Sequence, residues 1–266
     1  MDESIGRIAL MCQLLGMNCN VPTDICFSFR GFHHRGGRTD DHADGFGIAF
    51  FEGAGYRVFI DAQSAVDSPI AALIADYPIR SMNVIAHIRK ATQGEVALVN
   101  THPFVRELWG RYWIFAHNGN LENFRAEPGN SYRPVGATDS ESAFCYLLQT
   151  LHDRHPEGEP PLAALYAGLR ELSAELAQYG SFNFMLSNGE YLFAHCSTKL
   201  AYVLRQAPFR VAHLKDEDMA VDFSEVTTPD DRVAVIATEP LTDNERWTQF
   251  SAGELRVFHL GAPLKL

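Results

Sequence analysis

The sequence predicts an α+β fold in which antiparallel sheets are covered by helices. Segments of strand type come in clusters, and so do segments of helix type, which disfavours a doubly wound parallel fold. The dipeptide Asn188-Gly189 lies between two apolar runs, a strong signal for an antiparallel hairpin. With 266 residues, the chain can bury a sizeable core. A four-layer α/β/β/α sandwich and a simpler α+β domain both fit these observations.

The first half of the chain contains segments of both types. Short apolar segments rich in β-branched or aromatic residues are predicted as strands, and they are residues 12–19, 45–51, 56–60, 83–88 and 112–117. A helix is predicted over residues 22–32, from Pro22 to Phe32. Ser68 and Pro69 resemble the N-cap and the first residue of a second helix, which continues through residues 70–77.

The second half begins with helices and ends with strands. Thr138 and Glu141 fit a capping box that starts a helix over residues 141–151. Residues 154–161 are rich in proline, glycine and charge, which predicts a surface loop. Leucines at positions 162, 165, 169, 172 and 176 form a helical stripe, and Gly180 would end that helix. Further strands are predicted over residues 182–187, 190–195, 199–205, 232–238 and 255–260.

Composition excludes several functional classes. A formal net charge of -11 argues against a surface that binds nucleic acid. No apolar run approaches the roughly 20 residues of a membrane-spanning helix, and the first eleven residues lack the features of a signal peptide. The five cysteines are odd in number and include no CxxC pair, so we expect a reducing, cytoplasmic setting without a disulfide framework or a zinc site.

Histidines and aspartates gather in one early segment. These residues are His33, His34, Asp40, Asp41, His42 and Asp44. The segment has a loop-like composition, and the residues outnumber the ligands of any single site. We therefore predict no metal site here, and no cofactor elsewhere.

Cys12 is the first candidate for catalysis, because it directly follows Met11. If translation starts at Met11, or if residues 1–11 are cleaved, the thiol and a free α-amine lie on one residue. An α-amine has a pKa of about 7.7–8.0, so it can act as a base near neutral pH. A buried structural cysteine on a strand is the alternative, since free cysteine is often buried.

Two further segments place polar residues at the ends of apolar strands. Arg89 ends the strand before Thr92, and its planar guanidinium suits a substrate carboxylate. Asn118 and Gly119 follow His117, and a side-chain amide beside a backbone N–H in a tight turn can form an oxyanion hole. Taken alone, the first segment also fits a surface salt bridge, and the second also fits an ordinary Asn-Gly turn.

A fourth segment, residues 136–141, contains Asp139 in the first turn of a helix. A carboxylate there can accept a hydrogen bond from a substrate ammonium. It can equally complement the positive end of the helix dipole. The segment by itself does not decide between these roles.

Together, in this order, the four segments resemble class II glutamine amidotransferases. This N-terminal-nucleophile family includes the glutaminase domains of glucosamine-6-phosphate synthase and amidophosphoribosyltransferase. Residues 33–37 (HHRGG) and 44–47 (DGFG) also resemble the family's early motifs. Residues 100–104 (NTHPF) and 197–202 (STKLAY) are similar to phrases in small stand-alone bacterial members related to the γ-glutamyl amidohydrolase of ergothioneine synthesis.

The resemblance covers nearly the whole chain from Met11 and implies a fold and a set of roles. The fold would be a four-layer α/β/β/α sandwich of N-terminal-nucleophile hydrolase type with two mainly antiparallel sheets. Cys12 would be the nucleophile, and its freed amine the general base. The other implied roles are a carboxylate site at Arg89 supported by Thr92, an oxyanion hole at Asn118 and Gly119, and an ammonium site at Asp139.

The sequence departs from the family pattern in two places. Residues 1–11 precede the cysteine, so we predict that they are a leader or a mis-assigned start that is absent from the active form. We favour a start at Met11, and expect residues 12–266 to form a single type-2 glutamine amidotransferase domain. Lys90 and Gln93 stand where the family commonly has Trp and His, which affects the shape and closure of the pocket.

The expected activity is hydrolysis of the side-chain amide of glutamine or of a γ-glutamyl compound through a Cys12 thioester. The released ammonia would either leave or pass to a synthase partner protein, because we expect no room for a synthase domain after about residue 260. We expect no nucleic-acid or membrane partner. The alternative is a catalytically silent ligand-binding or regulatory protein on the same fold.

Overall fold

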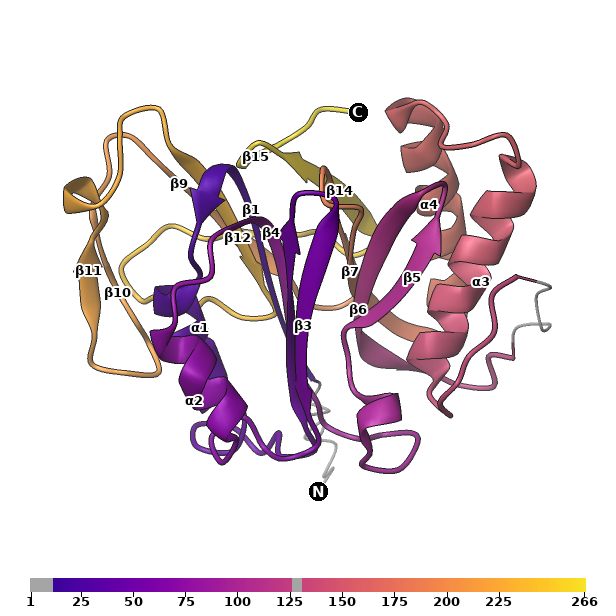
Figure 1. Ribbon diagram of the computed structural model, residues 1–266, viewed down its shortest axis with the longest axis horizontal. Coiled ribbons are helices and arrows are strands. Elements are labelled where there is room, and N and C mark those ends of the chain that lie inside the picture. The colour runs from indigo at the N-terminus through magenta and orange to yellow at the C-terminus, as the bar shows by residue number, and fades with distance from the viewer. Residues whose placement is uncertain (1–11, 126–130) are drawn as a thin grey trace, which may run out of the picture.

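Two β-sheets are stacked face to face, and helices cover their outer faces (Figure 1). The computed structural model describes residues 12–125 and 131–266, so the predictions for residues 1–11 lie outside the described residues. On one side of the sheets lie α1 (Cys26–His34) and α2 (Pro69–Asp76). On the other side lie α3 (Asp139–Arg154) and α4 (Leu162–Leu176). This arrangement confirms the predicted four-layer α/β/β/α sandwich.

Both sheets are antiparallel, as predicted. Within the described chain the first sheet has seven strands, in the order β13 (Thr248–Gln249), β9 (Ala201–Gln206), β12 (Arg232–Ala237), β1 (Gln13–Thr23), β4 (Ser81–Ile88), β2 (Phe46–Glu52) and β3 (Gly55–Asp61). The second has six, in the order β15 (Ala262–Pro263), β14 (Glu254–His259), β8 (Leu192–Cys196), β7 (Gly180–Ser187), β6 (Arg111–Leu121) and β5 (Phe104–Leu108). A separate ribbon pairs β10 (Val211–His213) with β11 (Ala220–Asp222). Short 3-10 turns cover Leu98–Asn100, Ala177–Tyr179 and Phe223–Glu225.

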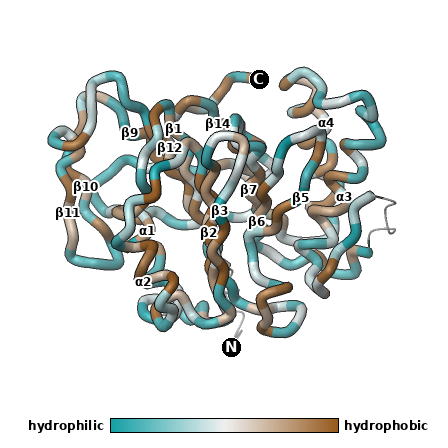
Figure 2. The backbone as a smooth tube through the Cα atoms, in the orientation of Figure 1, coloured by the Kyte–Doolittle hydropathy of each residue, from teal (hydrophilic) through white to brown (hydrophobic). Residues whose placement is uncertain are grey.

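Three apolar layers hold the sandwich together. Phe29 and Phe46 belong to the layer between the first sheet and α1 and α2. Leu14 and Met185 belong to the layer between the two sheets, and Phe144 to the layer between the second sheet and α3 and α4. Figure 2 shows hydrophobic residues along the central strands and hydrophilic residues in the peripheral loops. Each layer is therefore closed by elements that are distant in sequence.

Alternation along the central strands decides which side chains enter the space between the sheets. In β1, Leu14 packs between the sheets and Leu15 packs toward α1 and α2. In β6, Ala116 packs between the sheets and Phe115 packs toward α3 and α4. Because successive side chains of a strand point to opposite faces, residues two positions from Leu14 or Ala116 share their direction. This places Cys12 and Asn118 on facing surfaces.

The predicted helix over residues 22–32 is wrong at its start. Strand β1 continues to Thr23, which pairs with Ser81 after a register irregularity, and α1 begins only at Cys26. Pro22 therefore lies near the end of a strand, a position where the missing N–H is tolerated. The carboxylate of Asp24 accepts a hydrogen bond from the backbone N–H of Cys26 (3.2 Å) where the helix starts.

The hairpin and the first-turn cap were predicted more closely. Asn188 and Gly189 lie between the paired strands β7 and β8, and Gly189 has a φ of +89°, which favours glycine. Thr138 caps α3 by accepting a bond from the N–H of Glu141 (3.2 Å). The Glu141 carboxylate accepts from the Gly136 N–H (2.7 Å) instead of the Thr138 N–H, so the second hydrogen bond of the predicted capping box is not made. None of the described helices has the length and apolar character needed to cross a bilayer.

Candidate active site

Cys12 and Arg89 meet because they flank paired strands. Cys12 directly precedes β1 and Arg89 directly follows β4, and these strands pair with Gln13 opposite Ile88. From the other sheet, β6 approaches the same point. The resulting small cavity is lined by Cys12, His87, Arg89, Lys90, Thr92, Gln93, His102, His117, Gly119, Thr138, Asp139 and Ser140. Five of the six predicted site residues thus line one cavity.

The Cys12 thiol is held by the backbone of Lys90. Its Sγ donates to the Lys90 carbonyl (3.2 Å) and accepts from the Lys90 N–H (3.1 Å). Burial raises the pKa of Cys12 to about 11, although the Lys90 backbone and the nearby Arg89 charge act in the opposite direction. The thiol therefore keeps its proton at neutral pH, and forming a thiolate would require a base. Only the backbone of Lys90 makes these contacts.

Arg89 organises the loop that follows it. Its guanidinium donates to the carbonyls of Gln93 (3.0 Å), Gly94 (3.2 Å) and Glu95 (3.0 Å), and its side chain is buried. Burial lowers the pKa of Arg89, and the carboxylate of Asp44 opposes that shift. Thr92 lies in the same loop and is exposed at the cavity rim.

Gln93 ties this loop to the other sheet. Its side-chain Nε2 donates to Oδ1 of Asn120 in β6 (2.6 Å). Gln93 departs from the family pattern, as Lys90 does, and it lines the cavity that contains Cys12. The departure therefore replaces a histidine with a side chain that makes a specific interaction.

Asn118 and Gly119 lie inside β6 and are positioned by its pairing with β7, so the tight turn predicted here is wrong. Asn118 lies opposite Asn183, whose Nδ2 donates to the Asn118 carbonyl (3.0 Å). The Asn118 side chain is fully buried, and its Nδ2 donates to Oγ1 of Thr238 (3.2 Å). A Cβ on Gly119 would lie 1.8 Å from the carbonyl oxygen of Ser181, so only glycine fits there. The side chain of Asn118 is adjacent to the cavity, but it is not part of its lining.

Asp139 joins the start of α3 to the end of β6. Its Oδ2 accepts from the backbone N–H of Leu121 (2.7 Å), and its Oδ1 accepts from the N–H of Ser140 (2.9 Å). The carboxylate thus satisfies N–H groups at a strand end and at a helix start. An ionised carboxylate has about four acceptor positions, so capacity for a further donor remains.

Three buried histidines line the cavity together with the thiol. Burial lowers the pKa of His87 to about 3, and it also lowers those of His102 and His117. The rings of His87 and His102 lie 4.2 Å apart, and neither ring nitrogen of His102 has a hydrogen-bond partner among the described residues. His117 contacts Ser140 Oγ (2.8 Å). These imidazoles remain neutral at physiological pH and add no positive charge to the site.

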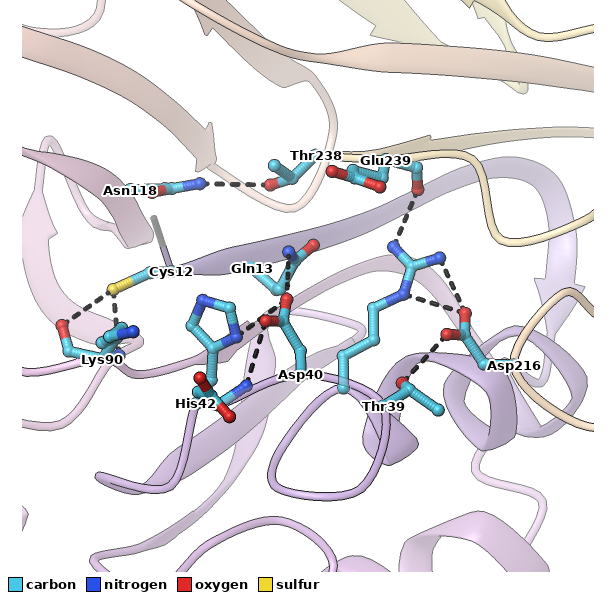
Figure 3. A network of polar contacts seen from close by, with 12 residues as sticks. Cys12, Gln13, Thr39, Asp40, His42, Lys90, Asn118, Asp216, Thr238 and Glu239 are labelled. Carbon is cyan, nitrogen blue, oxygen red and sulfur yellow. Dashed lines mark hydrogen bonds and ion pairs between the residues drawn. The ribbon is translucent and has the colours of Figure 1, made fainter. Parts of the chain in front are cut away.

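The early motifs, residues 33–37 and 44–47, hold chain segments next to the site. Figure 3 shows Asp216 and Glu239, two residues of this network. Arg35 pairs with Asp216 (2.8 Å) and also donates to the carbonyls of Glu239 (3.0 Å) and Pro240 (2.7 Å). In the second motif, Asp44 accepts a bond from the N–H of Ala91 (2.8 Å), just after Arg89. Both motifs therefore hold segments that flank the cavity.

Sequence reasoning missed Thr238, which follows β12 and contacts both Asn118 and the strand that carries Cys12. A polar residue ending an apolar strand was the available signal, and it is the same signal that identified Arg89. Across residues 12–125 and 131–266, no group of three or more His, Cys, Asp or Glu is arranged to hold a metal ion.

Comparisons with known proteins give consistent matches. The family model for class-II glutamine amidotransferases matches residues 11–266. The inferred glutamine amidotransferase YafJ of Escherichia coli strain K12 is 55% identical over 251 residues, which cover 94% of this chain and 98% of YafJ. An inferred glutamine amidotransferase of Haemophilus influenzae is 54% identical over 254 residues, which cover 96% of this chain and 86% of that protein.

Solved structures agree with the sequence matches. The crystal structure of a predicted glutamine amidotransferase from Pseudomonas aeruginosa PA01 superposes with a TM-score of 0.76 and 45% identity, covering 96% of this chain and 100% of that one. A glutamine aminotransferase class-II domain protein from Silicibacter pomeroyi has a TM-score of 0.56 and 18% identity, covering 95% and 97% of the two chains. The second likeness is one of fold.

Proposed function

The chain belongs to the class-II glutamine amidotransferase family, and we propose that it hydrolyses the side-chain amide of glutamine or of a γ-glutamyl compound, with Cys12 as nucleophile. One observation carries the proposal. Cys12, Arg89, Gly119 and Asp139 come from four separate parts of the chain and line one cavity. A thiol, a guanidinium, a strand glycine with its backbone N–H and a carboxylate together match the carbonyl, carboxylate and ammonium of such a substrate.

The reaction proceeds through a thioester. The Cys12 sulfur attacks the amide carbon while the thiol proton passes to the α-amine of the same residue. The oxyanion accepts hydrogen bonds from the Asn118 side chain and the Gly119 N–H. The intermediate collapses as the ammonium returns its proton to the leaving nitrogen, which departs as ammonia or an amine. Water then hydrolyses the γ-glutamyl thioester, forming a carboxylate and restoring the thiol.

The general base is the α-amine of Cys12. A thiol with a pKa of about 11 gives almost no thiolate at neutral pH, so proton transfer to a base must accompany attack. An α-amine with a pKa near 8 can accept that proton, whereas a peptide nitrogen cannot. We therefore propose that residues 1–11 are absent from the active form.

Arg89 and Asp139 bind the amino-acid end of the substrate. Three of the five guanidinium N–H groups of Arg89 donate to loop carbonyls, and the other two have no acceptor among the described residues. These two can bind a carboxylate, and Thr92, which lies at the cavity rim in the same loop, would support that binding. Asp139 has remaining acceptor capacity for the α-ammonium.

The test is ammonia or amine release from glutamine and a panel of γ-glutamyl amides, using protein whose first residue is verified as Cys12. Cys12→Ala should abolish release. Cys145→Ala is the matched control, because Cys145 is also a free thiol whose pKa burial raises to about 11, and it should retain activity. No release by the wild type from any of these compounds would favour the silent ligand-binding alternative.

The same panel separates two fates of the released nitrogen. Strong preference for one γ-glutamyl amide over glutamine indicates a stand-alone hydrolase. Preference for glutamine, with hydrolysis that rises when a synthase is added, indicates a subunit that supplies ammonia to a partner protein.

A further inference from the structure

Thr238 connects the two halves of the site. It directly follows β12, and its side chain is buried. Its Oγ1 accepts hydrogen bonds from the backbone N–H of Leu14 (2.9 Å) and from Nδ2 of Asn118 (3.2 Å). Figure 3 shows the second bond above Cys12. Leu14 belongs to the first sheet and Asn118 to the second, so one hydroxyl bridges the layer between the sheets.

Contacts on the backbone of Thr238 and of the residues after it hold Thr238 in place. Its backbone N–H donates to the carbonyl of Leu14 (3.1 Å), which makes the contact with β1 reciprocal. Arg35 donates to the carbonyls of Glu239 and Pro240, which immediately follow. Thr238 is also β-branched, so few side-chain rotamers are available to it. The hydroxyl oxygen is therefore a fixed acceptor.

The Asn118 amide depends on this acceptor. Its Oδ1 is buried and has no hydrogen-bond partner among the described residues, so the bond to Thr238 is the contact that orients the amide. An amide nitrogen has two hydrogens, and the bond to Thr238 uses one of them. The second hydrogen remains for a substrate oxygen. Because an oxyanion donor must lie about 2.7–3.1 Å from the developing charge, small rotations of the amide cost rate.

We propose that Thr238 is a positioning residue that sets the Asn118 amide relative to the strand carrying Cys12. This inference rests on the proposed function, in which Asn118 stabilises the oxyanion. Thr238 acts through Asn118 and does not touch the reacting atoms. A hydroxyl suits this role because its oxygen can accept two hydrogen bonds at once, one from each sheet.

The experiment is a double-mutant cycle in the active form of the protein. Thr238→Val keeps the shape but removes the acceptor, and should lower kcat roughly 10-fold with little change in KM. Thr238→Ser keeps the hydroxyl and should retain most of the activity. In an Asn118→Ala background, which lowers kcat by roughly 10²–10³-fold, Thr238→Val should cost less than about 2-fold more.

Thr242→Val is the matched control for a merely structural effect. Thr242 is a buried threonine four residues further on, and its hydroxyl accepts from Trp247 Nε1 (2.9 Å) and donates to Glu245 (2.8 Å). It should lower the urea midpoint to a similar extent as Thr238→Val and leave kcat unchanged. Hydrogen exchange at the Leu14 amide should accelerate in Thr238→Val and not in Thr242→Val, which checks the contact independently of activity.

The outcomes distinguish this inference from the proposed function. If the wild type is active but Thr238→Val leaves kcat unchanged, the role of Thr238 is overturned and the proposed function stands. The same holds if Thr238→Val lowers kcat equally in the wild-type and Asn118→Ala backgrounds. A wild type that begins at Cys12 and releases no ammonia or amine overturns the proposed function itself. Unchanged exchange at Leu14 in Thr238→Val overturns the bridging contact.

Discussion

Gly119→Ala tests the geometry that places the proposed oxyanion hole. An added Cβ would lie 1.8 Å from the carbonyl oxygen of Ser181 and 2.7 Å from Nε2 of His117. The first neighbour is backbone of the paired strand β7, where Gly119 lies opposite Phe182. Backbone in a sheet cannot move aside as the end of a flexible side chain can. The strands must therefore separate locally.

The cost follows from the required shift. Ordinary contact begins at 3.4 Å, so the Ser181 oxygen must retreat from 1.8 Å to 3.4 Å, which is a shift of 1.6 Å. That movement breaks its 3.0 Å contact with His117 Nε2. Overpacking costs about 1–3 kcal/mol, and leaving a buried partner unsatisfied costs about 1–3 kcal/mol. We expect the free energy of unfolding to fall by about 2–6 kcal/mol.

Urea unfolding followed by fluorescence measures this change, and Gly55→Ala is the matched control. Gly55 also lies in a strand, but a Cβ there would meet its nearest atom, the Glu52 carbonyl oxygen, at 3.5 Å. The control should unfold within about 0.5 kcal/mol of the wild type. The remaining folded Gly119→Ala protein should also show a reduced kcat, since the N–H of residue 119 is displaced. Equal midpoints for both variants would refute the close approach of β6 and β7.

Three further results are expected. Arg89→Lys keeps the charge but loses the planar guanidinium that binds three loop carbonyls, so KM for the substrate should rise by about 10-fold or more while kcat changes less. A fall in kcat alone would contradict the binding role. Protein made from Met1 should be inactive until residues 1–11 are lost, and protein made from Met11 should be active at once. Intact-mass measurement beside an ammonia assay checks both expectations. Full activity of an uncleaved chain would exclude the α-amine as the base. Burial holds the pKa of His87 at about 3, below its usual 6.5, so the folded state resists protonation and the stability present above pH 6.5 should be lost as the pH falls toward 3. In acid-unfolding curves, His87→Gln should flatten that loss of stability. An unchanged curve would show that other groups dominate the acid unfolding.

Local patterns in the sequence were sufficient for most of the fold. The stripe of leucines predicted α4, and Asn188 with Gly189 predicted the β7–β8 hairpin, because both depend on residues close in sequence. The resemblance to class II glutamine amidotransferases is confirmed by the family match over residues 11–266. The error at Pro22 has a local cause as well, since a proline near a strand end and one in a first helical turn are alike in sequence.

Tertiary structure decided what the polar residues contact. Ser140 bonds to His117, and Gln93 bonds to Asn120, because β6 and α3 meet the loop after β4 only in the folded chain. The sequence by itself singled out Cys12 and Asn118 as candidates through short motifs next to apolar segments. It could not identify Thr238 as their link, because Thr238 lies 120 residues from Asn118 and 224 from Leu14. Strand pairing and sheet stacking bring such residues together, and these are set by the burial of apolar faces over the whole chain rather than by local pattern.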